Sequence, residues 1–121
     1  MTTPMPNPEL IFKIANRDIV EKARISGVFT GMPIDQKDGY LHFSTAAQLP
    51  ETLRLYFAGQ RDVVLLAIRS SDMGAALRWE PSRGGQLFPH VYGTFRMDDV
   101  VHQEAVDVAD DGSCALPEWV R

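Results

Sequence analysis

Apolar residues are grouped along the chain in two kinds of pattern, and the first is typical of β-strands. Residues 63–68 are all apolar and begin with two valines, which indicates a central strand covered on both faces. Residues 10–14 are rich in strand-forming residues and are bounded by Pro8 and Asn16. The same reasoning predicts further extended segments at 40–44, 77–80, 87–95 and 100–108.

The second pattern is helical and lies in the first half of the chain. Asn16 is a candidate N-cap, Asp18 follows it in the first turn, and Gly27 is placed to end the helix. A second apolar face has spacings of i, i+4, i+7 and i+8 and predicts a helix that ends at Gly59, with Leu49, Leu53, Tyr56 and Phe57 on that face.

The start of the second helix is open to two interpretations. Thr45 and Gln48 have the spacing of a capping box. Pro50 lies too deep for the first helical position if Thr45 is the cap. Either the helix is kinked at Pro50, or a short turn precedes a helix that starts there. Residues 28–37 contain Gly31 and Pro33 and have no steady period, so we expect a loop with one short extended piece.

These elements predict an α+β fold with a mixed, mostly antiparallel sheet and one or two packed helices. The later strands are too close in sequence for repeated parallel crossovers, which need a dozen or more residues. We expect a flexible tail at residues 1–8 and a single globular domain at 9–121. Trp119 is expected to hold the C-terminal segment, and the predicted buried residues are Phe43, Leu53, Phe57, Leu65 and Ala67.

Composition excludes several classes of protein. The chain has 121 residues and a net charge of −4, which argues against general nucleic-acid binding. The longest apolar run is far shorter than the roughly 20 residues of a membrane span, and the N-terminus lacks the pattern of a signal peptide. A cytoplasmic location is therefore expected. The single cysteine, Cys114, excludes an internal disulfide and is interpreted as structural, and the histidine spacing predicts no metal site.

The first of three polar patches is residues 39–45. In a strand, Tyr40, His42 and Ser44 point to one side, while Leu41 and Phe43 point to the other side and face the core. The polar side chains would then lead to a helix N-terminus, where free N–H groups suit a phosphate or a carboxylate. The alternative is that Ser44 or Thr45 only caps the helix and that His42 lies on a solvated face.

The second patch is residues 78–85, which combine an acid, two arginines and two glycines beside a tryptophan. An arginine fork matches phosphates and carboxylates, and Gly84-Gly85 allows the backbone to approach a ligand. The alternative is a solvated turn in which Glu80 and Arg83 form a weak surface pair.

The third patch is residues 87–93. His90 and Tyr92 share a strand face with Phe88, and Pro89 suggests an edge strand or a bulge, where sites often open. The alternative is an aromatic cluster that covers the core. No nucleophile elbow, phosphate-binding loop or dinucleotide glycine motif is present in the sequence.

Three strings carry a resemblance to a known family: Gly39-Tyr40-Leu41-His42-Phe43-Ser44-Thr45, Arg78-Trp79-Glu80-Pro81-Ser82-Arg83-Gly84-Gly85, and Phe88-Pro89-His90-Val91-Tyr92-Gly93. They resemble the small bacterial family called domain of unknown function 952, over about residues 11–101. The resemblance implies a fold like the ADP-ribosylation fold of mono-ADP-ribosyltransferases and tRNA 2′-phosphotransferases. Those enzymes have an Arg or His on the first strand, where this chain has Lys13.

The resemblance also implies roles for individual residues, by analogy with the transferases. Glu80, His42 and His90 are the catalytic candidates, and the ligand-binding candidates are Ser44, Thr45, Arg83, Tyr92 and Tyr40. Glu80 would stabilise an oxocarbenium-like state or activate the acceptor, and Ser44 would orient Glu80. His42 would bind the ribose and Arg83 the diphosphate, while His90 and Tyr92 would stack on nicotinamide or position the acceptor.

Three hypotheses for function follow. The first is an ADP-ribosyltransferase-like enzyme with NAD or a related nucleotide as substrate and no further cofactor. The second is a non-catalytic binder of a small anionic or nucleotide-like ligand in the same cleft, which Lys13 in the first strand favours. The third is a protein-interaction module that uses the aromatic strip from Phe88 to Phe95.

Overall fold

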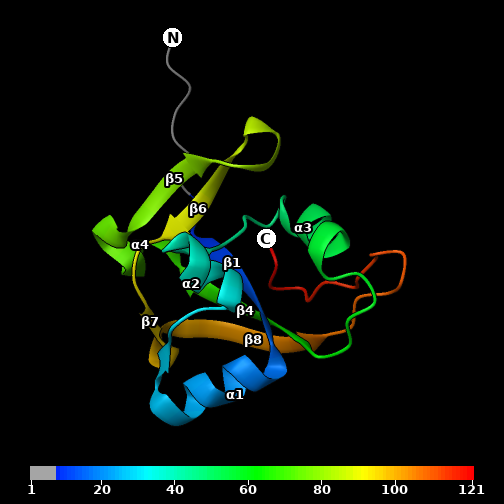
Figure 1. Ribbon diagram of the computed structural model, residues 1–121, viewed down its shortest axis with the longest axis horizontal. Helices are drawn as coiled ribbons and strands as arrows, with labels where there is room; N and C mark the ends of the chain where they lie inside the picture. Colours follow the sequence, from blue (N-terminus) through cyan, green and yellow to red (C-terminus); the bar gives the residue numbers. More distant parts are fainter. Residues whose placement is uncertain (1–7) are drawn as a thin grey trace.

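The central sheet is formed by three antiparallel strands in a computed structural model that describes residues 8–121 (Figure 1). The strands are β1 (Leu10–Asn16), β4 (Val63–Arg69) and β8 (Val100–Val106), in the order β1-β4-β8. Strand β4 lies in the middle and is buried from Val63 to Ile68, which confirms the prediction for this segment. Of the predicted tail, residues 1–7 lie outside the described residues, and the carbonyl of Pro8 accepts a hydrogen bond from Ser70 Oγ.

Two smaller sheets complete the strand content of the described residues. One has the order β3-β6-β5 and consists of β3 (Leu41–His42), β6 (Leu87–Val91) and β5 (Leu77–Pro81). The other pairs β2 (Val28–Phe29) with β7 (Phe95–Arg96). All of these pairings are antiparallel. The α+β class is thus confirmed, whereas the expectation of one mixed sheet is wrong: the strands separate into three antiparallel sheets.

Two helices cover opposite faces of the central sheet (Figure 1). Helix α1 (Arg17–Ser26) contributes Val20 and Ala23 to one apolar cluster, and α3 (Leu49–Tyr56) contributes Leu49 and Leu53 to the other. Alternate residues of β1 enter the two clusters: Ile11 packs with the α1 side and Phe12 with the α3 side. The described residues also contain α2 (Pro33–Asp38), α4 (Ser70–Met73) and the short 3-10 turns η1 (Gly74–Ala76), η2 (Arg83–Gly85) and η3 (Met97–Asp99).

The start of α3 follows the second of the two interpretations. A short turn precedes the helix, and Pro50 lies in its first turn. The predicted capping box is present: the Gln48 N–H donates to Thr45 Oγ1 at 3.2 Å, and the Thr45 N–H donates to Gln48 Oε1 at 3.0 Å. The predicted helix face is correct for Leu49 and Leu53, while Phe57 is half-buried.

Three local predictions are wrong. The expected short extended piece of residues 28–37 is present as β2, but the remainder is not all loop, because Pro33 takes the first position of α2, where a missing N–H costs no hydrogen bond. Tyr56 is 62% exposed and does not belong to the buried face of α3. Pro89 lies in β6, which is the middle strand of its sheet and not an edge. The Phe43 N–H donates to the Pro89 carbonyl at 3.0 Å, but Pro89 has no N–H to return the bond, so β3 ends at His42.

Of the remaining predicted core residues, Phe43, Leu65 and Ala67 are buried. Trp119 holds the C-terminal segment against the sheet, as expected. Its ring stacks on Phe12 with centroids 6.2 Å apart and on His102 at 5.1 Å.

Helix α3 offers a direct test of this packing. Leu53 is fully buried, so Leu53→Ala leaves a cavity and should lower the free energy of unfolding by about 2–5 kcal/mol. Leu55 lies on the same helix and is 44% exposed, so Leu55→Ala is the matched control and should change it by less than about 0.5 kcal/mol. Urea unfolding measures both variants, and equal losses would contradict the assigned face.

Candidate functional site

A buried ion pair lies between the central sheet and the β3-β6-β5 sheet. Lys13 is in the middle of β1, and its side chain is 3% exposed. Its Nζ lies 2.8 Å from Oδ2 of Asp35 in α2 and donates to the His42 carbonyl at 2.9 Å. Burial lowers the pKa of Lys13, because loss of solvation outweighs the attraction of the Asp35 carboxylate.

The carboxylate of Asp35 completes this arrangement. It accepts hydrogen bonds from the N–H of His42 at 2.9 Å and from the N–H of Met32 at 2.6 Å. The ion pair therefore holds both backbone polar groups of His42. The position of this candidate site residue is set by Lys13 and Asp35, which the sequence alone did not connect.

The strand register brings the predicted site residues together. His42 in β3 lies opposite His90 in β6, and His90 lies opposite Arg78 in β5. Directly opposed residues in antiparallel strands point to the same face of a sheet. Tyr40 precedes β3, and its ring stacks on His90 with centroids 4.2 Å apart. The same ring lies 4.7 Å from His42 and 5.2 Å from Tyr92.

Glu80 joins this cluster through one carboxylate oxygen. Its Oε1 accepts a hydrogen bond from the Tyr92 hydroxyl at 2.7 Å and lies 2.8 Å from His90 Nδ1. The hydrogen bonds from Tyr92 and then His90 hold the pKa of Glu80 below its usual value. The Arg78 guanidinium lies over the Tyr92 ring at 4.7 Å and adds a nearby positive charge. Glu80 is therefore an ionised carboxylate at neutral pH.

The two histidines of the cluster differ in their surroundings. His42 is partly exposed, and its Nε2 lies 2.8 Å from Oδ2 of Asp38 at the end of α2. His90 is 2% exposed, and its Nε2 is buried without a hydrogen-bond partner among the described residues. One imidazole thus faces solvent, and the other is held beneath Tyr40.

A second polar group lies beyond the end of β3. Ser44 lies two residues beyond His42, and its Oγ is 3.3 Å from Thr52 Oγ1. Arg83 donates from Nη1 to the same Thr52 hydroxyl at 3.2 Å, and its guanidinium lies 4.9 Å from the centre of the Phe88 ring. Gly84 and Gly85 have φ values of 66° and 76°, which lets the chain turn back after Arg83.

The predicted residues therefore separate into three positions. One cluster contains Tyr40, His42, Glu80, His90 and Tyr92, and Ser44 and Arg83 meet through Thr52. Thr45 serves as a cap for the turn before α3. The expectation that Ser44 orients Glu80 is wrong, because Ser44 bonds Thr52 and Glu80 is oriented by Tyr92 and His90.

Sequence reasoning missed Lys13, Asp35, Asp38 and Thr52 as residues that build the site. A lysine between apolar neighbours in a strand was the available signal for Lys13. Arg78 was noticed in its motif but not assigned to the site. Among the described residues, no group of three or more histidine, cysteine, aspartate or glutamate side chains is placed to hold a metal ion.

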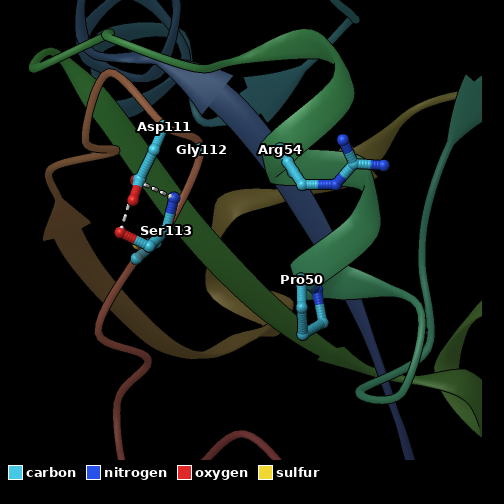
Figure 2. Close-up of a pocket in the computed structure, with 6 residues that line it drawn as sticks. Pro50, Arg54, Asp111, Gly112 and Ser113 are labelled. Atoms are coloured by element: carbon cyan, nitrogen blue, oxygen red, sulfur yellow. Dashed lines mark hydrogen bonds between the residues drawn. The ribbon is translucent and has the colours of Figure 1, made fainter.

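The clearest surface pockets of the described chain lie away from this cluster. One, of about 320 Å³, is bounded by Pro50 and Arg54 of α3 and by the turn at residues 111–114 (Figure 2). Its polar groups bond within their own segments: Asp111 accepts from Ser113, and Arg54 pairs with Glu51. Burial raises the pKa of the Cys114 thiol, in keeping with a structural cysteine. The other pocket, of about 340 Å³, lies between α1 and β8.

Removal of one partner of the buried ion pair should be strongly destabilising. Lys13→Met leaves the Asp35 carboxylate buried without its countercharge, so we expect a loss of about 3–5 kcal/mol in the free energy of unfolding. The double variant Lys13→Met/Asp35→Asn removes the unpaired charge and should recover part of that loss. Denaturant unfolding of both variants measures the difference, and a double variant less stable than Lys13→Met would contradict the assignment.

The state of Glu80 can be tested through its hydrogen bond from Tyr92. Tyr92→Phe removes the donor, so the pKa of Glu80 should rise toward its ordinary value of 4.5 in a carboxyl NMR titration. A folded-state pKa below the unfolded one stabilises the protein above the unfolded pKa, and this contribution is lost as pH falls through the folded pKa. Wild type should therefore lose more stability below about pH 4.5 than Tyr92→Phe.

Tyr40→Phe is the matched control for this titration, because the Tyr40 hydroxyl makes no hydrogen bond to Glu80 in the structure. It should leave the Glu80 titration close to that of wild type. An unchanged titration in Tyr92→Phe would show that the hydroxyl does not act on the carboxylate.

Comparison with known proteins places the chain in a family. The crystal structure of protein CC0527 from Caulobacter crescentus is similar, with 38% identity, a TM-score of 0.83, and coverage of 88% of this chain and 93% of that chain. The solution NMR structure of CC0527 gives 38% identity, a TM-score of 0.77, and coverage of 87% and 90%. No curated protein matches the sequence.

None of the helices among residues 8–121 is both long and apolar enough to cross a membrane. The family described as "Protein of unknown function (DUF952)" matches residues 14–103, which is most of the chain and includes the central strand β4 and the polar cluster. The chain therefore belongs to this family, whose function is not established.

Proposed function

We propose that the polar face of the β3-β6-β5 sheet binds a nucleotide-like ligand, with NAD as the candidate substrate, and cleaves its nicotinamide–ribose bond. The observation that carries this proposal is the ionised Glu80 carboxylate held by Tyr92 and His90 beside the exposed part of an aromatic cluster. The ADP-ribosylation-like fold belongs to the same proposal and is supported by the sequence motifs that contain these residues.

The chemistry of the bond suits a carboxylate of this kind. Cleavage of an N-glycosidic bond passes through an oxocarbenium-like state, as glycoside hydrolysis does, and a nearby negative charge stabilises it. Both hydrogen bonds to Glu80 end on Oε1, so Oε2 is left to face the ribose. Because the pKa of Glu80 is lowered, the negative charge is present at neutral pH.

The remaining groups on this face suit the other parts of a dinucleotide. Tyr92 is 36% exposed and Tyr40 is partly exposed, so their rings are available to stack on a flat heterocycle. Arg83 uses one nitrogen for Thr52 and has further N–H groups for a diphosphate. His42 is partly exposed beside Tyr40 and is placed to bond a ribose hydroxyl.

Binding without turnover is the second candidate function, and Lys13 favours it. The transferases that the motifs resemble have an Arg or His on the first strand. Here Lys13 is buried, and its ammonium group is bonded to Asp35 and to the His42 carbonyl. It therefore stabilises the fold in place of contacting a ligand. A protein-interaction module is less well supported, because Phe88 and Phe95 of the aromatic strip are buried.

A thermal-shift titration with NAD tests binding. At tenfold excess over the dissociation constant, a ligand stabilises the folded state by about 1.4 kcal/mol. For a domain of this size that corresponds to a rise in melting temperature of about 5 °C. Arg83→Ala should abolish the shift, and Arg83→Lys should restore little of it, because the planar fork is lost. His42→Ala should weaken the shift and leave the melting temperature of the free protein nearly unchanged.

The control for the binding test is Arg61→Ala, because Arg61 is exposed and makes only a long 3.9 Å contact with Asp110 away from the cluster. This variant should bind NAD as wild type does. If NAD, its related nucleotides and simple phosphate esters leave the wild-type melting temperature unchanged at millimolar concentration, the nucleotide proposal is wrong.

Release of free nicotinamide separates the two candidate functions. The enzyme hypothesis expects slow release from NAD by wild type and its loss in Glu80→Gln, which keeps the shape of the side chain and removes its charge. If wild type shows a thermal shift with NAD but releases no nicotinamide, the enzyme hypothesis is wrong and the binding hypothesis is supported.

A further inference from the structure

We infer that Nε2 of His90 is the proton-accepting atom of this site and that Glu80 positions it, with the Tyr40 ring stacked over the imidazole in the free protein. This inference rests on the proposed function for the identity of the ligand, since it names the group that takes a proton from the acceptor. It differs from the expectation that Glu80 itself activates the acceptor.

The hydrogen bonds of Glu80 define the proton positions on His90. An ionised carboxylate only accepts hydrogen bonds, so the contact of 2.8 Å between Glu80 Oε1 and His90 Nδ1 requires a proton on Nδ1. A neutral imidazole protonated on Nδ1 has its lone pair on Nε2. This is the arrangement in which a carboxylate orients a histidine base in hydrolase triads.

His90 Nε2 is the unusual atom in this cluster. The side chain is 3% exposed, and Nε2 has no hydrogen-bond partner among residues 8–121. Buried polar atoms are nearly always paired, and an unpaired one lowers stability. In this position, beside an ionised carboxylate and two tyrosines, Nε2 is available to accept a proton from a ligand hydroxyl.

Tyr40 is the ring that stacks on this imidazole, with centroids 4.2 Å apart. It lies between Gly39, which has a φ of 85°, and the first residue of β3, so its side chain can turn away without breaking the pairing of β3 with β6. Movement of this side chain gives an acceptor hydroxyl access to the imidazole. The charged and titratable side chains around His90 come from each neighbouring element: Tyr40, His42, Arg78, Glu80 and Tyr92.

The chemical step follows from this geometry. A hydroxyl group, from water or from an alcohol, forms a C–O bond to the ribosyl carbon as the C–N bond to nicotinamide breaks. The bonding electron pair leaves with nicotinamide, which becomes neutral, and the hydroxyl proton moves to His90 Nε2. Glu80 then faces an imidazolium and balances its charge, and the proton later passes to solvent.

Tautomer analysis by NMR tests this assignment in the protein alone. In wild type at neutral pH, two-bond nitrogen–proton correlations should show His90 protonated on Nδ1 and unprotonated on Nε2. Glu80→Ala removes the acceptor, so the proton should move to Nε2, whereas Tyr40→Phe should leave it on Nδ1. Protonation of Nε2 in the wild-type protein, as a neutral tautomer or as an imidazolium, would overturn the inference.

Chemical modification tests whether the Tyr40 ring shields His90. Diethyl pyrocarbonate reacts with unprotonated imidazole nitrogen, and mass spectrometry locates the product. His102 is exposed and should react in every variant, which makes it the internal control. His90 should be protected in wild type and in Tyr40→Phe, which keeps the ring, and should react in Tyr40→Ala. Equal protection in Tyr40→Ala would show that Tyr40 is not the cover.

The acceptor role itself is measured with NAD as the probe. His90→Gln should keep the NAD-induced thermal shift and reduce nicotinamide release by about a hundredfold or more. Undiminished release would show that His90 is not the base. If wild type releases no nicotinamide, the proposed cleavage fails, whereas the tautomer and modification results still decide the state of His90 independently.

Discussion

The buried ion pair of Lys13 and Asp35 is the interaction on which the rest of the site depends. It joins β1 of the central sheet to α2, and it holds the backbone of His42 at the end of β3. A buried ion pair adds little net stability compared with apolar residues of the same size, yet loss of one partner is costly. Its effect here is therefore geometric: β1, α2 and β3 fit together only in the arrangement that satisfies both charges and both polar groups of His42.

Much of the fold could be predicted because its signals are local. The apolar run at 63–68, the glycine that ends α1 and the pair of Thr45 and Gln48 each act over a few residues, and each is found where expected. Asn16 precedes α1 as predicted, but its side chain bonds Gln60 and does not cap the helix. Helix α2 was missed because a proline can either interrupt a strand or helix or occupy the first turn of a helix. The sequence around Pro33 does not distinguish these two cases. The role of Lys13 was missed because its partner is 22 residues away and is brought near only by the fold.

The candidate site was predictable as a set of residues and not as a set of contacts. Alternation along a strand correctly predicted that Leu41 and Phe43 are buried and that Tyr40 lies beside His42. Which residues meet across strands depends on register, and register is set by long-range pairing that one sequence does not reveal. The pairing of β3 with β6 places His42 opposite His90. Glu80 is oriented by Tyr92 and His90, whereas the hydroxyl of Ser44 contacts Thr52.

The Lys13–Asp35 pair and the Glu80–His90 pair have different roles, because only the second pair has polar atoms without a hydrogen-bond partner in the described chain. Lys13 and Asp35 neutralise each other inside the core, and the polar groups around them are paired, so they define structure and offer nothing to a ligand. Glu80 and His90 are paired on one side only. One carboxylate oxygen and one imidazole nitrogen are left without a partner in the described chain, at the edge of an aromatic cluster. An ion pair that fixes the positions of β1, α2 and β3 can maintain such a reactive arrangement nearby, because its own charges are satisfied without the side chains of Glu80 and His90.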